Sequence, residues 1–116
     1  MVSIHTGLSA LNAFATGVQG TAYNIAHINT AGFQPVSVDY RSGRPADHGV
    51  RPVVTRPPAD TTVSATPAAG QSLPVSHVNE AREMTKLIVN QRSFEANAVV
   101  IRASDDLIGT LIDLKI

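Results

Sequence analysis

The sequence has no cysteine and no tryptophan, and aromatic residues make up 4% of its 116 positions. Without cysteine there is no disulfide framework and no thiolate chemistry. Charged residues make up 16%, below the roughly 25% typical of soluble domains, and the formal net charge is zero. A neutral chain gives no electrostatic reason to expect nucleic acid or an anionic membrane as partner, and neutrality favours self-association.

The first twenty residues lack the features of a secretory leader. They contain no basic region followed by an apolar block, and Gly, Ser, Thr, Asn and Gln interrupt any long hydrophobic run. A cleaved signal peptide and a membrane span both need such a block. We therefore expect a protein that leaves the cytoplasm without a cleaved signal peptide, if it leaves at all, and that does not insert into the membrane.

Residues 1–38 contain no Asp, Glu, Lys or Arg. Apolar or small residues recur there every three or four positions, which predicts a helix from Ser3 to Asn29 with a coiled-coil-like seam. Glycines cost about 1 kcal/mol each against alanine in a helix, so Gly7, Gly17 and Gly20 make sense if they let a neighbour approach closely. The predicted seam is Ile4, Leu8, Leu11, Ala15, Val18, Ala22 and Ile25.

The helix is expected to end near Asn29, with Gly32 in a left-handed cap and Phe33 packed back on the last turn. All 7 prolines follow, within residues 34–74. Alternating apolar residues predict short strands in a β-ribbon or extended arm, and the prolines restrict these strands to edges or hairpin ends. The strand residues are Val36, Val38 and Tyr40, then Val53 and Val54, with loops at 42–48 and 65–73.

A second long helix is predicted from Val78 to Leu114, with Ser76 or Asn79 as its N-cap. Glu80 and Glu83 lie in its first turns, where the helix dipole favours acidic groups. We expect its apolar stripe to pack against the first helix, since no other helix in the chain could cover it. The stripe is Met84, Leu87, Ile88, Phe94, Ala98, Ile101, Ile108 and Ile112, supplemented by Val100, Leu107, Leu111 and Leu114.

The predicted fold class is therefore mainly α, in one domain over residues 1–116. Two long terminal helices pair as an antiparallel, coiled-coil-like hairpin, and a short Pro-rich middle segment is β-rich or extended. The N-terminal helix and its cap occupy residues 1–33, the middle segment 34–74, and the C-terminal helix 75–116.

No arrangement of residues indicates catalysis. The four histidines show no metal-ligand spacing, the acidic residues suit a solvated helix face, and a Gly-rich phosphate loop is absent. Four arginines in the middle segment are largely offset by aspartates, so they favour solubility or interfacial ion pairs over nucleic-acid binding. We expect no enzyme activity, no metal and no cofactor.

A two-helix hairpin would cover only one face of the charge-free helix. Its other faces carry Phe14, Val18, Tyr23 and Ile28 and no charge. Such faces are best covered by further copies of a similar helix, so the pattern favours self-assembly. The alternative is a secreted helical-hairpin adhesin or effector, which would tolerate a charge at Phe14 or Gln19.

Both ends carry specific motifs. The segment ALNAFATGVQGTAYNIAHINTAGF and the later segment EMTKLIVNQRSFEAN resemble the two terminal signatures of flagellar basal-body rod and hook proteins. In the first, His27 stands where the family usually has Asn. The residues that carry the resemblance are Ala10, Leu11, Ala13, Asn24, Ile25, Ala26, Asn29, Thr30, Gly32 and Phe33, then Glu83, Met84, Gln91, Arg92, Phe94, Glu95, Ala96 and Asn97.

The resemblance implies a structural subunit of the flagellar basal-body rod, exported through the flagellar export apparatus and assembled with other copies and other rod subunits. The short middle segment is most similar to the proximal-rod subunits, particularly the C-type, and the location implied is the rod that crosses the periplasm. The residues we expect at the assembly interface are Ile4, Leu8, Leu11, Phe14, Val18, Ile25, Asn29, Phe33, Met84, Leu87, Gln91, Phe94, Asn97, Ile101 and Ile108.

Overall fold

The structure is a computed structural model that describes residues 2–43, 49–58 and 75–114. It contains two long helices joined through a β-hairpin, which confirms the mainly α fold. The predicted loops at 42–48 and 65–73 lie largely outside the described residues. The elements in chain order are α1 (Val2–Ala26), β1 (Ser37–Ser42), β2 (Val50–Thr55) and α2 (Glu80–Asp113).

Helix α1 ends at Ala26, three residues before the predicted end. Its last turn tightens, because the amides of His27 and Ile28 bond to carbonyls three residues back, as at many helix ends. Gly32 then has a φ of 66°, a conformation that glycine adopts without steric cost. The left-handed glycine predicted after the helix is therefore confirmed.

Helix α2 begins where the N-cap chemistry places it. The Asn79 side chain accepts a 3.0 Å hydrogen bond from the amide of Arg82, which satisfies one of the free amides of the first turn. Of the two predicted caps, Asn79 is correct, whereas the Ser76 hydroxyl accepts from the Val78 amide before the helix starts. The helix then runs for 34 residues, roughly 50 Å at 1.5 Å per residue.

Strands β1 and β2 form a two-stranded antiparallel sheet, where short strands were predicted from the apolar residues of the middle segment. Tyr40 faces Pro52 across the sheet. The Gly43 amide bonds to the Gly49 carbonyl, and the alternation of an antiparallel ladder then makes Tyr40 and Pro52 a non-hydrogen-bonded pair. Proline therefore costs the ladder no hydrogen bond at this position.

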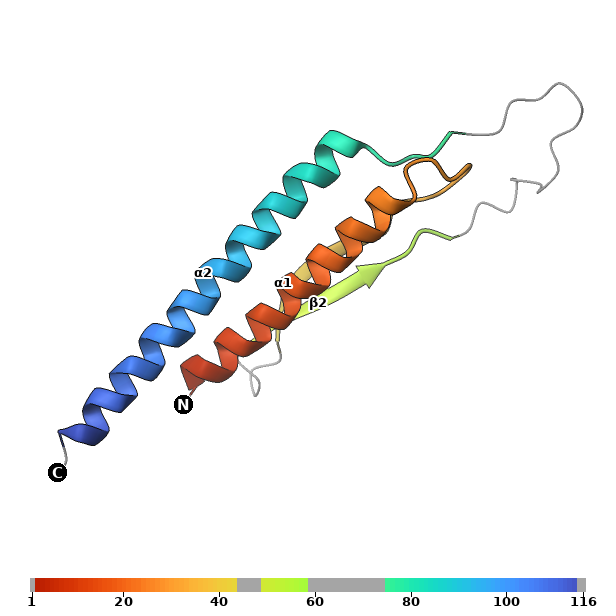
Figure 1. The fold of residues 1–116 in the computed structure, drawn as a ribbon. Helices are drawn as coiled ribbons and strands as arrows, with labels where there is room; N and C mark the ends of the chain where they lie inside the picture. Colours follow the sequence, from red (N-terminus) through yellow and green to blue (C-terminus); the bar gives the residue numbers. More distant parts are fainter. Residues whose placement is uncertain (1, 44–48, 59–74, 115–116) are drawn as a thin grey trace, which may run out of the picture.

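The two helices run antiparallel, side by side, and the sheet lies against α1 (Figure 1). Along the pair, Gly7 lies beside Ile101, Gly17 beside Asn90, and Asn24 beside Glu83. The buried apolar core is small, because it contains only Ala10, Ala13 and Val36 among the described residues. Two packed helices and one hairpin bury little surface, as expected of so small a domain.

The predicted seam on α1 is wrong by one residue. Leu8 is 59% exposed, while Ile4, Leu11, Val18 and Ile25 are only half-buried. The residues that face α2 and the sheet are small or polar, because bulky side chains there would hold the neighbouring elements apart. The buried positions on α1 are Gly7, Ala10, Ala13, Gly17, Thr21 and Asn24.

The predicted stripe on α2 needs the same correction. Leu87 and Ile101 are half-buried on the side of α1, but Met84 and Ile88 are 47% and 60% exposed. The two fully buried residues of α2 are polar, Glu83 and Asn90. The exposed members of the predicted stripe are Met84, Ile88, Phe94, Ala98, Ile108 and Ile112.

The expected role of the three helical glycines is confirmed. A Cβ at Gly7 would lie 2.8 Å from Ile101 of α2, and one at Gly20 would lie 2.6 Å from Val38 of β1. A Cβ at Gly17 would overlap the Tyr40 hydroxyl. Each glycine therefore allows a close approach of another element, which offsets its poor helix propensity.

Candidate assembly interface

A polar junction ties together α1, β1 and α2. The Asn24 amide nitrogen donates to the Val36 carbonyl at 2.8 Å and to the Glu83 carboxylate at 3.0 Å. The Asn24 amide oxygen accepts from the Val36 backbone amide at 2.8 Å. Lys86 completes the junction, since its Nζ lies 2.8 Å from the second Glu83 oxygen. Asn24 is 1% exposed and Glu83 4%, so these bonds replace water within the protein.

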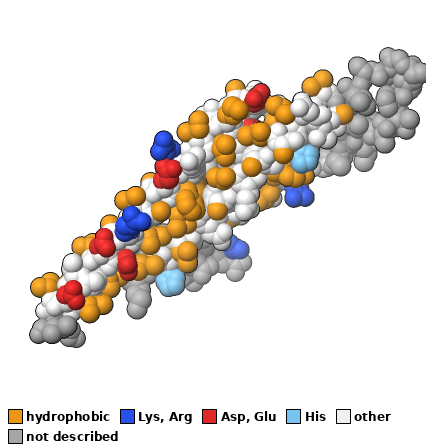
Figure 2. Space-filling view, in the orientation of Figure 1, with side chains coloured by type: hydrophobic (Ala, Val, Ile, Leu, Met, Phe, Trp, Pro, Cys, Tyr) orange, Lys and Arg blue, Asp and Glu red, His pale blue; other side chains and the backbone are white. Residues whose placement is uncertain are grey.

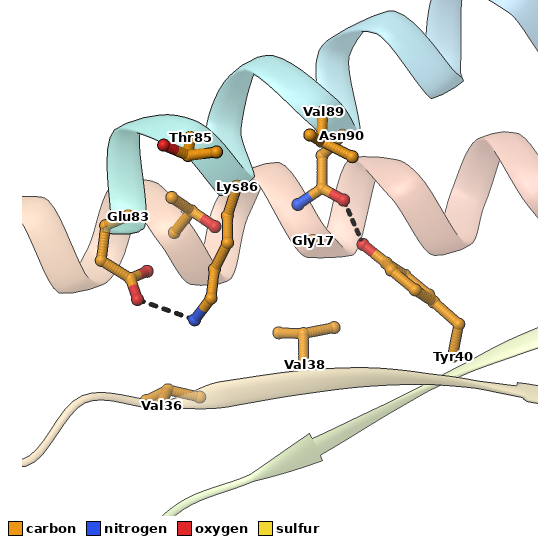
Figure 3. Close-up of a pocket in the computed structure, with 10 residues that line it drawn as sticks. Gly17, Val36, Val38, Tyr40, Glu83, Thr85, Lys86, Val89 and Asn90 are labelled. Atoms are coloured by element: carbon orange, nitrogen blue, oxygen red, sulfur yellow. Dashed lines mark hydrogen bonds and ion pairs between the residues drawn. The ribbon is translucent and has the colours of Figure 1, made fainter. Parts of the chain in front are cut away.

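A second polar contact holds β1 against α2. The Tyr40 hydroxyl donates to the Asn90 side-chain oxygen at 2.7 Å, and burial raises the pKa of the Tyr40 phenol. The Tyr40 ring also packs against Phe14, with the ring centroids 5.1 Å apart. Phe14 therefore lies under the hairpin and not on a free outer face as predicted. Figure 3 shows Tyr40 and Asn90 beside a groove of about 270 Å³ that is lined by residues of α1, β1 and α2.

Aromatic residues close the end of α1, as predicted for Phe33. Its ring stacks on the His27 imidazole at 4.6 Å and lies 5.7 Å from the ring of Tyr23. The His27 Nδ1 lies 2.8 Å from the Tyr23 carbonyl, and because a carbonyl only accepts, Nδ1 carries the proton. His27 thus makes a side-chain hydrogen bond at the helix end. Arg56 lies over the Tyr23 ring, 5.9 Å from its centre.

Many exposed apolar residues of the two helices lie on the same side of the hairpin, although Val89, Val100 and Leu107 of α2 are also exposed and lie on the other side. Successive helical residues are 100° apart around the helix axis. The apolar stripe of each helix comes one residue after the buried positions of that helix, as Leu8 follows Gly7 and Met84 follows Glu83. Because the helices are antiparallel, this rotation carries both stripes to one side. The sheet contacts α1 through residues that precede the seam, Ser9 and Gly20 among them, so it lies on the other side.

We call this surface the two-helix face. It consists of Leu8, Leu11, Ala15, Val18, Ala22 and Ile25 from α1, with Met84, Ile88, Phe94 and Ala98 from α2. Figure 2 shows hydrophobic side chains gathered along the two helices, while the Lys, Arg, Asp and Glu side chains lie mostly along α2. Contiguous exposed apolar patches mark interaction sites more often than single exposed residues do.

The remaining predicted interface residues lie in three places. Asn29 is exposed in the turn after α1, and Gln91 is exposed on α2 with its amide 3.3 Å from Glu95. Asn97 is half-buried and bonds to the Ser93 carbonyl. Ile108 is 38% exposed. Gln91 follows the buried Asn90 by one residue, so it lies on the two-helix face between Met84 and Ala98. The role of these residues at an interface remains a prediction.

Sequence reasoning missed the polar residues of the seam. Asn24 was placed in a terminal motif with no structural role, Glu83 was given a structural role only through the helix dipole, and Asn90 and Tyr40 were not placed at a contact between elements. One available signal is the seven-residue spacing of Glu83, Asn90 and Asn97, which repeats every two helical turns. The periodicity of large apolar residues does not reveal this polar repeat.

The described residues show neither a metal cluster nor a membrane helix. No group of three or more His, Asp or Glu side chains in that part of the chain could hold a metal ion. Among the described helices, none has an apolar stretch sufficient to cross a membrane.

Comparison with known proteins supports the resemblance seen in the motifs. Residues 69–114 match the family described as flagellar basal body rod FlgEFG protein C-terminal. This segment of the chain therefore resembles the C-terminal part of flagellar rod and hook proteins. The chain is also similar to the flagellar hook protein FlgE of two Helicobacter pylori strains, 26695 and J99, with 43% identity over 47 residues.

That similarity covers 40% of this chain and 6% of the length of each hook protein. The matched family segment contains α2 and its polar seam residues. Both matches are to flagellar rod or hook proteins, which supports a structural role in the flagellum.

Proposed function

We propose that this protein is a structural subunit of the flagellar basal-body rod that self-assembles through its terminal helices. The observation that carries the proposal is the two-helix face. Its α1 half is drawn from 38 consecutive residues without Asp, Glu, Lys or Arg, yet Leu8, Met84 and Ile88 are about half exposed or more in the single chain. A surface of this kind gains free energy when a similar surface covers it.

The partners in this proposal are further copies of the chain and other rod subunits. A contact between unlike surfaces of identical subunits builds an open helical array when the rotation between neighbours does not close a ring. The short middle segment favours a proximal-rod position of the C-type over the hook, because it leaves little room for an added domain. Export through the flagellar apparatus and a place in the periplasm-spanning rod complete the proposal, and the family match favours it over a secreted adhesin or effector.

The test is a charge placed on the two-helix face. Leu8→Asp should leave the hairpin folded, because Leu8 is 59% exposed in the single chain. In an assembly the same carboxylate would be buried without a partner, at a cost of several kcal/mol. At 1.4 kcal/mol for each tenfold change, we expect association to weaken at least about 100-fold.

The matched control is Val100→Asp. Val100 is 57% exposed and comes one residue before the half-buried Ile101, so it lies on the side of α2 away from the two-helix face. Circular dichroism should show both variants folded, and sedimentation velocity should show association lost only in Leu8→Asp. In a strain lacking the gene, only Val100→Asp should restore swimming. Normal assembly and motility with Leu8→Asp would refute the proposed interface.

A further inference from the structure

The seam of α2 repeats a polar residue every two turns. Glu83, Asn90, Asn97 and Ser104 are spaced by seven residues, and all four are buried or half-buried. Facing positions on α1 include Asn24, Gly17 and Ala10, also seven apart. If α2 slid along α1 by one repeat of seven residues, each polar residue of α2 would again face a small or polar residue of α1. We call each such facing pair a layer of the seam. The packing of small groups therefore does little by itself to fix one register.

Only one of these layers contains a carboxylate. In the observed register Asn24 donates to Glu83 at 3.0 Å. After a slide of seven residues Asn24 would meet Asn90, and Asn97 would take the place of Asn90 beside Tyr40. Only the contact of Asn24 would then lose its carboxylate acceptor. A neutral amide oxygen is a weaker acceptor than a carboxylate. Because Asn24 and Glu83 are 1% and 4% exposed, water does not make up this difference.

Asn24 also links the helix register to the position of the sheet. Both backbone groups of Val36 bond to the same Asn24 side chain, which holds the start of β1 against α1. The Asn24 amide has one remaining hydrogen, and Glu83 accepts it. A single buried side chain thus fixes β1 and α2 relative to α1.

We propose that the contact between Asn24 and Glu83 selects the register of the two helices. Glu83 is a positioning residue in this proposal, since it acts by placing α2 and not by touching a neighbouring subunit. A slide of one repeat would move α2 by about 10 Å along α1. The two halves of the two-helix face would then be offset by about 10 Å, and this consequence rests on the proposed function.

The register can be measured in the single chain by the distance between two spin labels. The sequence contains no cysteine, so Gln19→Cys and Asp106→Cys provide exposed label sites on α1 and α2. Glu83→Met tests the contact, because it removes the carboxylate and leaves Asn24 bonded to Val36. Glu95→Met is the control, since Glu95 is exposed on α2.

The doubly labelled chain without a further substitution and the same chain with Glu95→Met should each give the same single distance between the two labels. Glu83→Met should add a second population whose label separation is shorter by about 10 Å, with helix content by circular dichroism retained. If Glu83→Met keeps its helices and gives only the original distance, the proposal is overturned.

A second variant covers the case in which Glu83→Met does not fold. Glu83→Gln keeps the size and an acceptor oxygen but removes the charge, and it should also show the shorter distance in part of the molecules. A single unchanged distance in Glu83→Gln would then overturn the proposal. Because the labelled chains are measured unassembled, failure of the wild-type chain to assemble would refute the proposed function and leave the register result intact.

Discussion

Replacing Gly17 by alanine should destabilise the fold even though alanine favours helices. Alanine improves helix propensity by about 1 kcal/mol over glycine. Against this gain, the added Cβ would overlap the Tyr40 hydroxyl and lie 2.8 Å from the Asn90 amide nitrogen. Overpacking of this kind costs about 1–3 kcal/mol, and losing the hydrogen bond from Tyr40 to Asn90 costs about 1 kcal/mol more.

The expected net loss is therefore roughly 1–3 kcal/mol. Since 1 kcal/mol shifts the Tm of a small domain by about 4–8 °C, thermal unfolding followed by circular dichroism should show a Tm at least about 4 °C lower. Gly109→Ala is the matched control, because no atom outside its own helix turn lies within 4 Å of the added Cβ. Its Tm should be unchanged or higher.

A double variant shows whether the overlap is the cause. Tyr40→Phe removes the hydroxyl that the new Cβ would meet, so Gly17→Ala should cost less in that background than in the wild-type chain. The difference is the coupling energy of a double-mutant cycle. A Gly17→Ala Tm equal to or above that of the wild-type chain would refute the close approach of β1 and α2 to this glycine.

Three further changes test the polar contacts. Asn24→Ala leaves the Val36 amide and carbonyl without their partner. Because each unsatisfied buried group costs about 1–3 kcal/mol, urea unfolding should show a free energy of unfolding lower by roughly 3 kcal/mol. A decrease of less than about 1 kcal/mol would contradict the junction. Asn79→Ala removes the N-cap of α2 and should cost about 1 kcal/mol in the same assay, whereas no change would mean that the cap is dispensable. Burial raises the pKa of Tyr40 above 10.0, so the folded state prefers the protonated phenol, and this stability is present below pH 10 and lost as pH rises through the folded pKa. Tyr40→Phe should lose less stability than the wild-type chain between pH 9 and pH 11, and equal losses would count against a role for this phenol.

The local structure of the chain was within reach of the sequence. N-cap chemistry places the start of α2 at Asn79, and glycine's tolerance of positive φ marks the turn at Gly32. The alternation of Val36, Val38 and Tyr40 marks the first strand, and the apolar pair Val53 and Val54 marks the second. The glycines of α1 indicated close packing because each would otherwise weaken the helix. These signals depend on a few neighbouring residues, so they can be recognised without the tertiary fold.

The sequence by itself determined two long helices, a short hairpin and a charge-free first helix, because caps, turns and periodicity are local properties. Only the tertiary structure decided which side of each helix is buried. Leu8 and Met84 belong to regular apolar stripes, yet Gly17 and Asn24 occupy the contacts with β1 and α2. The physical reason is that close approach and hydrogen bonding between distant segments depend on side-chain size and partner position, which periodicity does not record.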